Sequence, residues 1–400
     1  MQPTATRSRA GAGPFAVVAG TLFVLLLDGN LPTPLYGVYR EEFGFSGTTL
    51  TLIFAVYAIA LIPSLLVFGQ LSDRIGRRPV IAGGLAVGAV GLLLLALAES
   101  TAMLLVARAV QGVALGTAVG TVPAALVELE PSGDPSRAAM ATVLGQSGGS
   151  AAGPLLTGVL AQWAPAPHEL CYIAGLVLTL AAIAGVLAIR EPRRPSGSWR
   201  LQKPSVPAQI RAPFARAGVT CAAVWAIGAL FLSVVPTYAA DLLDTDNLAL
   251  LGVISALMLA TACAVQAVCL RGAVTPRRAQ VLGLMLLIAG LVALVSAFPL
   301  HALSLVLAAA VLTGSGLGLG YFGAQADINR LAPPDRRGEV TAAFITCVYA
   351  SVSVTAISTG LLSDAFSLET AVAITATVVG VAAAATIVWH LQRSQARPHY

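Results

Sequence analysis

The chain has 400 residues, of which 57% are hydrophobic and only 10% charged, and its mean hydropathy is +0.85. A soluble globular domain carries about 25% charged residues, so this composition excludes a soluble enzyme and a disordered scaffold. It predicts an all-α membrane protein that crosses the bilayer many times.

Twelve apolar stretches are each long enough to cross a bilayer, for which about 20 residues are needed. In chain order, the twelve transmembrane helices are expected near 15–37, 50–70, 79–98, 102–127, 139–161, 170–189, 217–239, 248–271, 279–298, 302–326, 340–362 and 370–391. The first stretch follows Arg7 and Arg9, as the apolar part of a signal peptide would. It is longer than a signal peptide and shows no small-residue cleavage site, so we expect it to remain as the first helix.

Positive charges are distributed unevenly among the loops. If the N-terminus lies in the cytoplasm, 21 of the 23 Lys and Arg residues fall on the cytoplasmic side, and the exceptions are Arg40 and Arg108. Cytoplasmic loops are enriched in Lys and Arg, so both termini are expected in the cytoplasm. The net charge of +5 then reflects topology rather than nucleic-acid binding. The preference for Arg over Lys, with spans rich in Ala, Val and Gly, is typical of a GC-rich bacterial genome and favours the bacterial cytoplasmic (inner) membrane.

A polar, Pro-rich and basic stretch interrupts the series of apolar segments in the middle of the chain. It covers residues 191–216, and we interpret it as a cytoplasmic linker between an N-terminal six-helix half, 1–190, and a C-terminal six-helix half, 217–400. The halves repeat with an offset of about 202 residues, which pairs Thr157-Gly158 with Thr359-Gly360, and Gly112, Leu115 and Gly116 with Gly314, Leu317 and Gly318. Parallel repeats of this kind are typical of transporters that bind their substrate between two halves.

The loop between the second and third apolar stretches has the sequence GQLSDRIGRRPVI, over residues 69–81. Gly69 allows close packing at the end of the second helix, and Gly76 allows a tight turn. Asp73 lies at the membrane boundary beside three arginines, where an ion pair can form or break as the halves move. A simple positive-inside anchor would explain the arginines, but it would explain neither the acid nor the glycines.

This loop resembles the signature loop of the major facilitator superfamily, whose pattern is G-x-L-a-D-r-x-G-r-k. The matching residues are Gly69, Leu71, Asp73, Arg74, Gly76, Arg77 and Arg78. The resemblance implies the fold of that superfamily, twelve transmembrane helices in two six-helix halves. It also implies that the loop is a cytoplasmic latch that closes against the eleventh helix.

The fifth apolar stretch contains the sequence GGSAAGPLLTG, which begins at position 148. Gly149 and Gly153 are one turn apart and form a small-residue stripe for close packing, and Pro154 bends the helix. Together with Gly158, this pattern resembles a motif of drug–proton antiporters, although Thr157 replaces one of its glycines. The resemblance implies efflux, and an ordinary tight helix contact is the alternative.

Two charged residues lie inside apolar stretches. Asp28 is near the middle of the first helix, where an ionised acid is costly, and such acids usually serve transport. Arg108 lies in the fourth helix and, with Gln111 and Gly112, resembles the R-x-x-Q-G motif of the same superfamily. At 1.5 Å per residue the two side chains reach comparable depths. We predict that Asp28 accepts the proton or binds a cationic substrate while Arg108 tunes its ionisation, with a fixed structural ion pair as the alternative.

Four aromatic residues lie at depths where a central cavity is expected. Phe23, Tyr57, Trp225 and Tyr321 are the candidates for contact with an amphipathic substrate, and ordinary packing is the alternative for each of them.

These patterns together predict a proton-coupled exporter of small amphipathic or drug-like molecules, which works as a monomer in the bilayer. The partners expected are a small-molecule substrate, protons and lipid. No enzymatic activity, cofactor or metal site is expected, because the single lysine, Lys203, lies in no phosphate-binding loop and the four His show no metal-ligand spacing. The alternatives are proton-coupled uptake of a metabolite or sugar by symport, and a membrane sensor that does not transport.

Overall fold

The computed structural model describes residues 12–191, 204–272, 274–334 and 336–395. Over these ranges the chain forms helices joined by short loops, without a β-strand. The all-α class predicted from composition is therefore confirmed. Residues 192–203 of the predicted linker lie outside the described residues, as do Arg7 and Arg9.

The described part of the N-terminal half contains eight α-helical segments, one short 3-10 helix and one π-helical turn. In chain order they are α1 Ala12–Asn30, η1 Thr33–Leu35, α2 Tyr36–Phe43, α3 Gly47–Ile75, α4 Arg77–Ala96, α5 Thr101–Leu129, α6 Pro135–Val143, η2 Leu144–Gly148, α7 Gly149–Trp163 and α8 Leu170–Ala188.

The C-terminal half follows the same order of long and broken helices. Its segments are η3 Ala208–Ile210, α9 Arg211–Ser233, α10 Val235–Leu243, α11 Leu248–Cys269, α12 Pro276–Ala297, α13 Leu303–Leu331, α14 Arg337–Ala365 and α15 Leu368–Gln395.

Eleven helical segments of the described residues are long and apolar enough to cross a membrane, judged by length and composition. The remaining predicted span, 139–161, is built from α6, η2 and α7, which follow one another without a loop. The backbone stays in the right-handed helical region through η2, which is a π-helical turn. The twelve predicted spans therefore each correspond to a helical segment of the structure.

Several boundaries differ from the sequence prediction, and one of the differences is that the seventh predicted span, 217–239, is divided between α9 and α10. The first predicted span, 15–37, is divided between α1, η1 and α2, because Pro32 and Pro34 cannot continue the hydrogen-bond ladder of α1. Helix α9 begins at Arg211, inside the stretch predicted as linker, since Pro213 is tolerated in a first helical turn.

Side-chain caps mark the starts of several long helices. Ser46 accepts a hydrogen bond from the backbone N–H of Thr49 at the start of α3, and Ser100 does the same for Met103 in α5. Asn247 caps α11 in the same manner. These oxygens satisfy backbone donors that have no partner within the helix.

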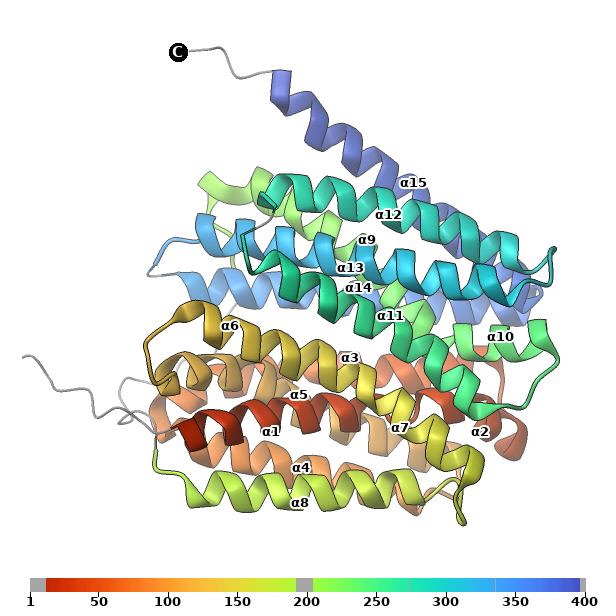
Figure 1. Cartoon of the computed structure of the whole chain (residues 1–400), viewed down its shortest axis with the longest axis horizontal. Coiled ribbons are helices and arrows are strands. Elements are labelled where there is room, and N and C mark those ends of the chain that lie inside the picture. Colours follow the sequence, from red (N-terminus) through yellow and green to blue (C-terminus); the bar gives the residue numbers. More distant parts are fainter. Residues whose placement is uncertain (1–11, 192–203, 273, 335, 396–400) are drawn as a thin grey trace, which may run out of the picture.

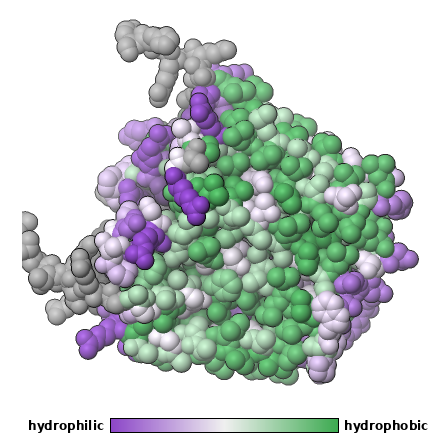
Figure 2. Space-filling view, viewed as in Figure 1, coloured by the Kyte–Doolittle hydropathy of each residue, from purple (hydrophilic) through white to green (hydrophobic). Residues whose placement is uncertain are grey.

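The two halves lie side by side, with their long helices roughly parallel (Figure 1). The strongest packing between the halves joins α3 to α14 and α7 to α11. Figure 2 shows hydrophobic residues over the broad middle of one face and hydrophilic residues toward the two ends of the helices. This distribution fits a bilayer around the middle of the bundle.

Candidate functional site

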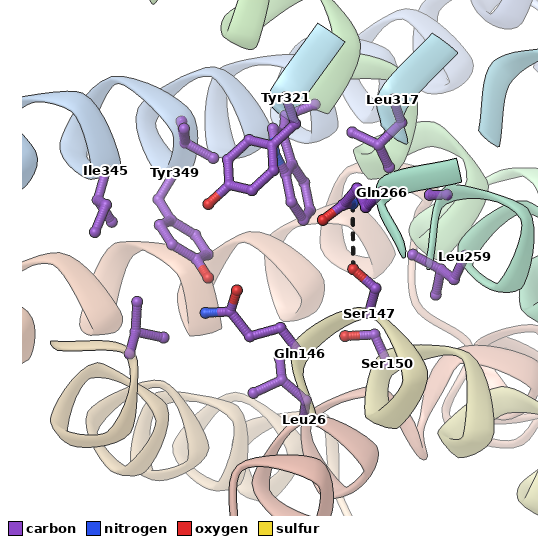
Figure 3. A pocket seen from close by; sticks show the side chains of 14 residues that line it. Leu26, Gln146, Ser147, Ser150, Leu259, Gln266, Leu317, Tyr321, Ile345 and Tyr349 are labelled. Carbon is purple, nitrogen blue, oxygen red and sulfur yellow. Dashed lines mark hydrogen bonds between the residues drawn. The ribbon is translucent and has the colours of Figure 1, made fainter. Parts of the chain in front are cut away.

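A cavity lies between the two halves near the middle of the bundle (Figure 3). It contains about 630 Å³ of space not occupied by atoms, a volume that includes open solvent. Its lining residues are Leu26, Val119, Gln146, Ser147, Ser150, Trp225, Leu259, Ala262, Gln266, Leu317, Tyr321, Ile345, Val348 and Tyr349.

The π-helical turn η2 supplies two polar side chains to this cavity, those of Gln146 and Ser147. The turn is held by close packing on α1, because a side chain at Gly145 would meet Leu22 at 3.1 Å. A side chain at Gly149 would meet the Cα of Phe23 at 3.0 Å. π-Turns within α-helices are frequent at functional sites, and this one shifts two polar side chains toward the partner half.

Polar and aromatic contacts shape the cavity wall. The amide nitrogen of Gln266 on α11 donates to the hydroxyl of Ser147 at 3.3 Å, which links the two halves. The rings of Trp225 and Tyr321 meet edge to face, with centroids 5.8 Å apart. The buried indole nitrogen of Trp225 has no hydrogen-bond partner among the described residues. A bound molecule with an acceptor group can satisfy this donor.

Two of the four predicted cavity residues line the cavity and two do not. Trp225 and Tyr321 are part of its wall. Phe23 lies instead where α1 crosses α7, and its backbone packs against Gly149. Tyr57 is buried, and its ring is covered by the guanidinium of Arg108, which lies 4.6 Å from the ring centroid.

Asp28 is buried in α1 and points away from the central cavity, toward α8. One carboxylate oxygen accepts a hydrogen bond of 2.5 Å from the hydroxyl of Thr179. The other oxygen has no hydrogen-bond partner among the described residues and would lie 2.8 Å from a side chain at Gly175. Among the described residues, a single side-chain hydrogen bond therefore orients this carboxyl group.

Arg108 is also buried, but it forms no ion pair with Asp28 within the described structure. Its guanidinium donates to the carbonyl of Gly29 at 2.8 Å and to the side-chain oxygen of Gln111 at 2.6 Å. Gln111 in turn donates to the backbone carbonyl of Asp28 at 3.0 Å. The predicted pairing of the two side chains is thus replaced by a link through the backbone of α1, because the two side chains leave their helices in different directions.

The glycines and the proline of the fifth-helix pattern lie at helix crossings. Gly153 faces α1, where an added side chain would meet the carbonyl oxygen of Leu27 at 2.5 Å. Gly158 faces α11 of the other half, where the carbonyl oxygen of Leu248 would be 2.7 Å away. The carbonyl oxygen of Pro154 lies against Gly252 on α11. The pattern therefore joins α7 to α1 on one side and to the C-terminal half on the other.

The predicted latch loop joins α3, α4 and α5 within the N-terminal half. Arg77 pairs with Asp73 at 2.6 Å and with Glu128, at the end of α5, at 3.3 Å. The carboxylate of Asp73 is more than half exposed, at 54%. No ion pair joins Asp73 to α14 within the described ranges, and both ion pairs of Arg77 lie within the N-terminal half.

Glu191 holds the turn at Gly76 in place. Its carboxylate accepts hydrogen bonds from the backbone N–H groups of Arg77 at 2.6 Å and Arg78 at 3.1 Å. Gly76 has φ +106°, and any side chain there would meet this carboxylate. The guanidinium of Arg78 donates to the carbonyl of Val186 at the end of α8, whereas Arg74 is exposed at the helix end.

Glu130 organises the loop that follows α5. Its buried carboxylate accepts hydrogen bonds from the Ser132 hydroxyl and from the backbone N–H of Asp134, and Arg137 lies 3.3 Å away. Burial acts to raise the pKa of Glu130, but these hydrogen bonds and the charge of Arg137 outweigh it and hold the pKa below its ordinary value.

The end of the bundle that is predicted to face outward is closed by reciprocal caps between the halves. The carboxylate of Asp364, at the end of α14, accepts hydrogen bonds from the backbone N–H groups of Gly47 at 2.7 Å and Thr48 at 3.0 Å, at the start of α3. The side-chain oxygen of Gln162, at the end of α7, accepts from the backbone N–H of Leu248 at 2.8 Å, at the start of α11. Each half thus caps a helix N-terminus of the other half.

These caps follow the internal repeat. The offset of about 202 residues that pairs Thr157-Gly158 with Thr359-Gly360 also pairs Gln162 with Asp364. A side chain at Gly360 would meet the Cα of Thr48 at 2.9 Å, as one at Gly158 would meet α11. The repeat detected in the sequence therefore marks the two places where the halves meet most closely at this end.

Sequence reasoning missed the polar residues of the cavity and of the closure, namely Gln146, Ser147, Gln266, Gln162, Asp364 and Glu191. A signal was present for one pair, because extension of the repeat by four residues from Gly158 and Gly360 reaches Gln162 and Asp364. No sequence pattern predicts the π-turn η2. In a regular α-helix the side chain of Gln146 would point in a different direction.

The fold and the central cavity define a membrane transporter built from two six-helix halves. The family model of the Major Facilitator Superfamily matches residues 18–275 and 273–399. The chain belongs to this superfamily, and it is a multi-pass secondary transporter.

The curated relatives that match are similar over only part of their length. The quinolone resistance protein NorA of Staphylococcus aureus is 24% identical over 180 residues, which are 44% of this chain and 45% of that protein. The inner membrane transport protein YajR of Escherichia coli is 38% identical over 97 residues, 23% of this chain and 21% of that protein. The chain thus spans less than half of the length of either relative.

Solved structures match almost the whole chain. A transporter of the POT family in complex with 5-aminolevulinic acid has a TM-score of 0.78 at 13% identity, covering 94% of this chain and 96% of that one. The nucleoside transporter NupG has a TM-score of 0.75 at 12% identity, covering 94% and 99%. At these identities the likeness shows the shared fold and leaves the substrate open.

Proposed function

We propose that this protein is a proton-coupled exporter of small amphipathic or drug-like molecules that works by alternating access. The observation that carries the proposal is the cavity between the halves, which combines neutral polar groups with aromatic rings beneath a closed outer end. The partial similarity to a quinolone resistance protein supports export. The contacts of Gly158 and Gly360 support a closure that opens and re-forms during transport.

Asp28 is the proposed proton carrier. Its carboxyl group is buried, oriented by Thr179, and has one oxygen without a partner among the described residues. Leu26, two residues earlier on α1, lines the cavity, and Gly153 packs on α1 from α7. A proton that binds to or leaves Asp28 alters the packing of α1 against α8, and α1 transmits this change to the cavity and to α7.

Each half of the exchange is coupled to the protonation state of Asp28, and with an uncharged substrate each cycle carries one positive charge inward. In the outward-open state Asp28 takes up a proton from outside and the substrate leaves the cavity. In the inward-open state the proton is released to the cytoplasm and a new substrate molecule enters. The described structure is closed at its predicted outer end, so in this cycle it differs from the outward-open state.

Proton flux in proteoliposomes under an imposed pH gradient tests the proposal, with cationic, neutral and sugar-like compounds as probes. The wild type is expected to move protons against the direction of substrate, and Asp28→Asn is expected to abolish this movement while the folded protein remains in the membrane. Glu99→Gln, which neutralises an exposed acid in a loop, is the matched control and is expected to behave as wild type. Movement of protons in the same direction as the substrate would contradict proton-coupled export and indicate symport. Equal flux in wild type and Asp28→Asn would show that Asp28 is structural.

The topology and oligomeric state belong to the same proposal. We propose that both termini face the cytoplasm of a bacterial cell, since the basic residues gather at that side, and that the monomer is the working unit, because one chain encloses the whole cavity. A membrane-impermeant maleimide is expected to label Glu369→Cys in whole cells and to leave Gln209→Cys unlabelled. The opposite result would invert the topology.

A further inference from the structure

We infer that the substrate is uncharged: an amphipathic molecule with an aromatic or apolar body and neutral hydrogen-bonding groups. This inference rests on the proposed function, since it assigns the ligand of the same central cavity. The fourteen residues of the cavity wall include amides, hydroxyls, an indole and two phenols, and none of them carries a charge.

The polar groups of the wall are suited to a neutral ligand. The buried indole nitrogen of Trp225 is a donor without a partner among the described residues. Figure 3 shows the side chains of Gln146, Tyr321 and Tyr349 extending into the same space between the halves. An amide and two hydroxyl groups can each donate and accept, so carbonyl, hydroxyl and amide groups of a ligand all find a partner here.

A cation would lack a counter-ion in this cavity. The carboxylate of Asp28 is directed to Thr179 on α8, away from the wall. The charged group that comes near the wall is itself a cation, because Arg108 lies 4.6 Å from the ring of Tyr57, whose ring centroid is 6.4 Å from that of Tyr349. An uncompensated charge in a desolvated site is costly.

The aromatic rings do not replace the missing carboxylate. Trp225 and Tyr321 are packed edge to face, at an interplanar angle of 85°, and Tyr321 is also stacked on Phe344 at 6.4 Å. An aromatic cage for a quaternary ammonium group needs several ring faces turned toward the cation. An anion is also disfavoured. Arg108 is not part of the cavity wall: its guanidinium packs on the ring of Tyr57, and it is Tyr57 that contacts the wall residue Tyr349. The wall therefore selects against both signs of charge.

The test uses three dansyl sulfonamides that differ only in the tail, which ends in a hydroxyl, a trimethylammonium or a carboxylate group. Binding to the full chain in lipid nanodiscs at about pH 8 is followed by dansyl fluorescence. We expect the hydroxyl probe to bind about ten-fold more tightly than either charged probe. Equal or tighter binding of the trimethylammonium probe to the wild type would overturn the inference.

A single added charge should reverse the preference. Gln146→Glu places a carboxylate in the wall, so it is expected to tighten binding of the trimethylammonium probe about ten-fold and to weaken binding of the carboxylate probe. Gln209→Glu, at an exposed position in η3, is the matched control and should leave all three affinities unchanged. Gln266→Glu repeats the test from the other half if Gln146→Glu fails to fold. Unchanged preference in a folded Gln146→Glu protein would contradict the assignment of this wall as the binding site.

The same probes separate this inference from the proposed function. Tight binding of the hydroxyl probe without proton-linked flux in proteoliposomes would support a binding site for an uncharged ligand and contradict the proposed proton-coupled export. Proton-linked export of the trimethylammonium probe by the wild type would keep the exporter and overturn the uncharged ligand.

Discussion

At the scale of single residues, neighbours decide what a charged side chain can do. Asp28 and Arg108 lie close along the bundle axis, yet Asp28 bonds to Thr179 while Arg108 bonds to Gly29 and Gln111. The charge of Arg108 is thus surrounded by neutral oxygens and the Tyr57 ring, and one carboxylate oxygen of Asp28 has no hydrogen-bond partner among the described residues. Depth along a helix follows from sequence, but the direction of a side chain depends on how the helix is rotated.

The carboxylate of Glu130 is expected to stabilise the folded protein in a pH-dependent way. Its folded pKa lies below the ordinary value of 4.5, so its stabilising effect is fully present above about pH 4.5 and is lost as the pH falls through the lower folded value. Glu130→Gln is therefore expected to lower the melting temperature of the purified protein at about pH 7, and the gap to wild type should close as the pH falls below about 4.5.

Glu42→Gln, which removes an exposed carboxylate, is the control for this series and is expected to show no such gap. A gap that stays constant down to about pH 3.5 would show that the hydrogen bonds of Glu130 do not depend on its charge.

At the scale of helices, small residues set how closely two elements approach. α7 uses Gly149 and Gly153 against α1 and Gly158 against α11. α14 uses Gly360 against α3 in the corresponding place. Lipid tails are as apolar as the helix surfaces, so the hydrophobic effect does not drive helices together within the bilayer. Close backbone packing is therefore a main source of helix association there. The outer closure therefore rests on backbone contact together with the caps from Asp364 and Gln162.

The element-scale prediction is that Gly360→Ala loosens the outer closure. An added methyl group would meet the Cα of Thr48 at 2.9 Å and the carbonyl oxygen of Gly47 at 3.0 Å. Overpacking of this kind costs about 1–3 kcal/mol, which shifts the open and closed populations by roughly ten-fold. Spin labels at Glu42→Cys and Glu369→Cys are expected to report a longer distance in the variant by double electron–electron resonance.

Gly83→Ala is the matched control for this variant, because Gly83 is a helical glycine with no atom within 4 Å of the added methyl group. An unchanged distance distribution in Gly360→Ala would mean that α3 and α14 do not set the closure.

At the scale of the whole molecule, two similar halves enclose one cavity and meet at one end through reciprocal contacts. Among the described residues, hydrogen bonds join the halves at the predicted outer end, through Asp364 and Gln162, and nearer the middle, through Gln266 with Ser147 and Cys263 with the carbonyl of Val143. The latch loop at the opposite end is bound to its own half by Arg77. Alternating access then requires the outer contacts to break while contacts at the other end form.

The whole-molecule prediction is that a disulfide across the outer closure stops transport. The ideal Cβ position of Gly47 lies 3.4 Å from the Cβ of Ser363, close to the separation that a disulfide requires. Gly47→Cys with Ser363→Cys, in a background without the five native cysteines, is expected to lose nearly all flux on oxidation and to regain it on reduction. Binding of the hydroxyl probe should persist, because in the proposed cycle a transporter held closed at the outer end can still open its cavity to the other side.

The single variant Gly47→Cys, oxidised in the same way, is the control and is expected to transport at its own reduced-state rate. Full flux in the oxidised double variant would show that the outer end does not open during transport.

The class of protein, the number of spans and the superfamily could be predicted from the residues alone, because long apolar stretches and the residues of the loop 69–81 are local properties of the chain. The glycines at which helices cross and the charged residues within the spans were visible in the same way. The groups that face the cavity, the absence of an ion pair between Asp28 and Arg108 within the described residues, and the caps from Gln162 and Asp364 became visible only once the helices were packed together. An apolar helix in lipid carries little hydrophobic contrast between its faces, so its rotation is fixed by packing against its neighbours and not by its own pattern of residues.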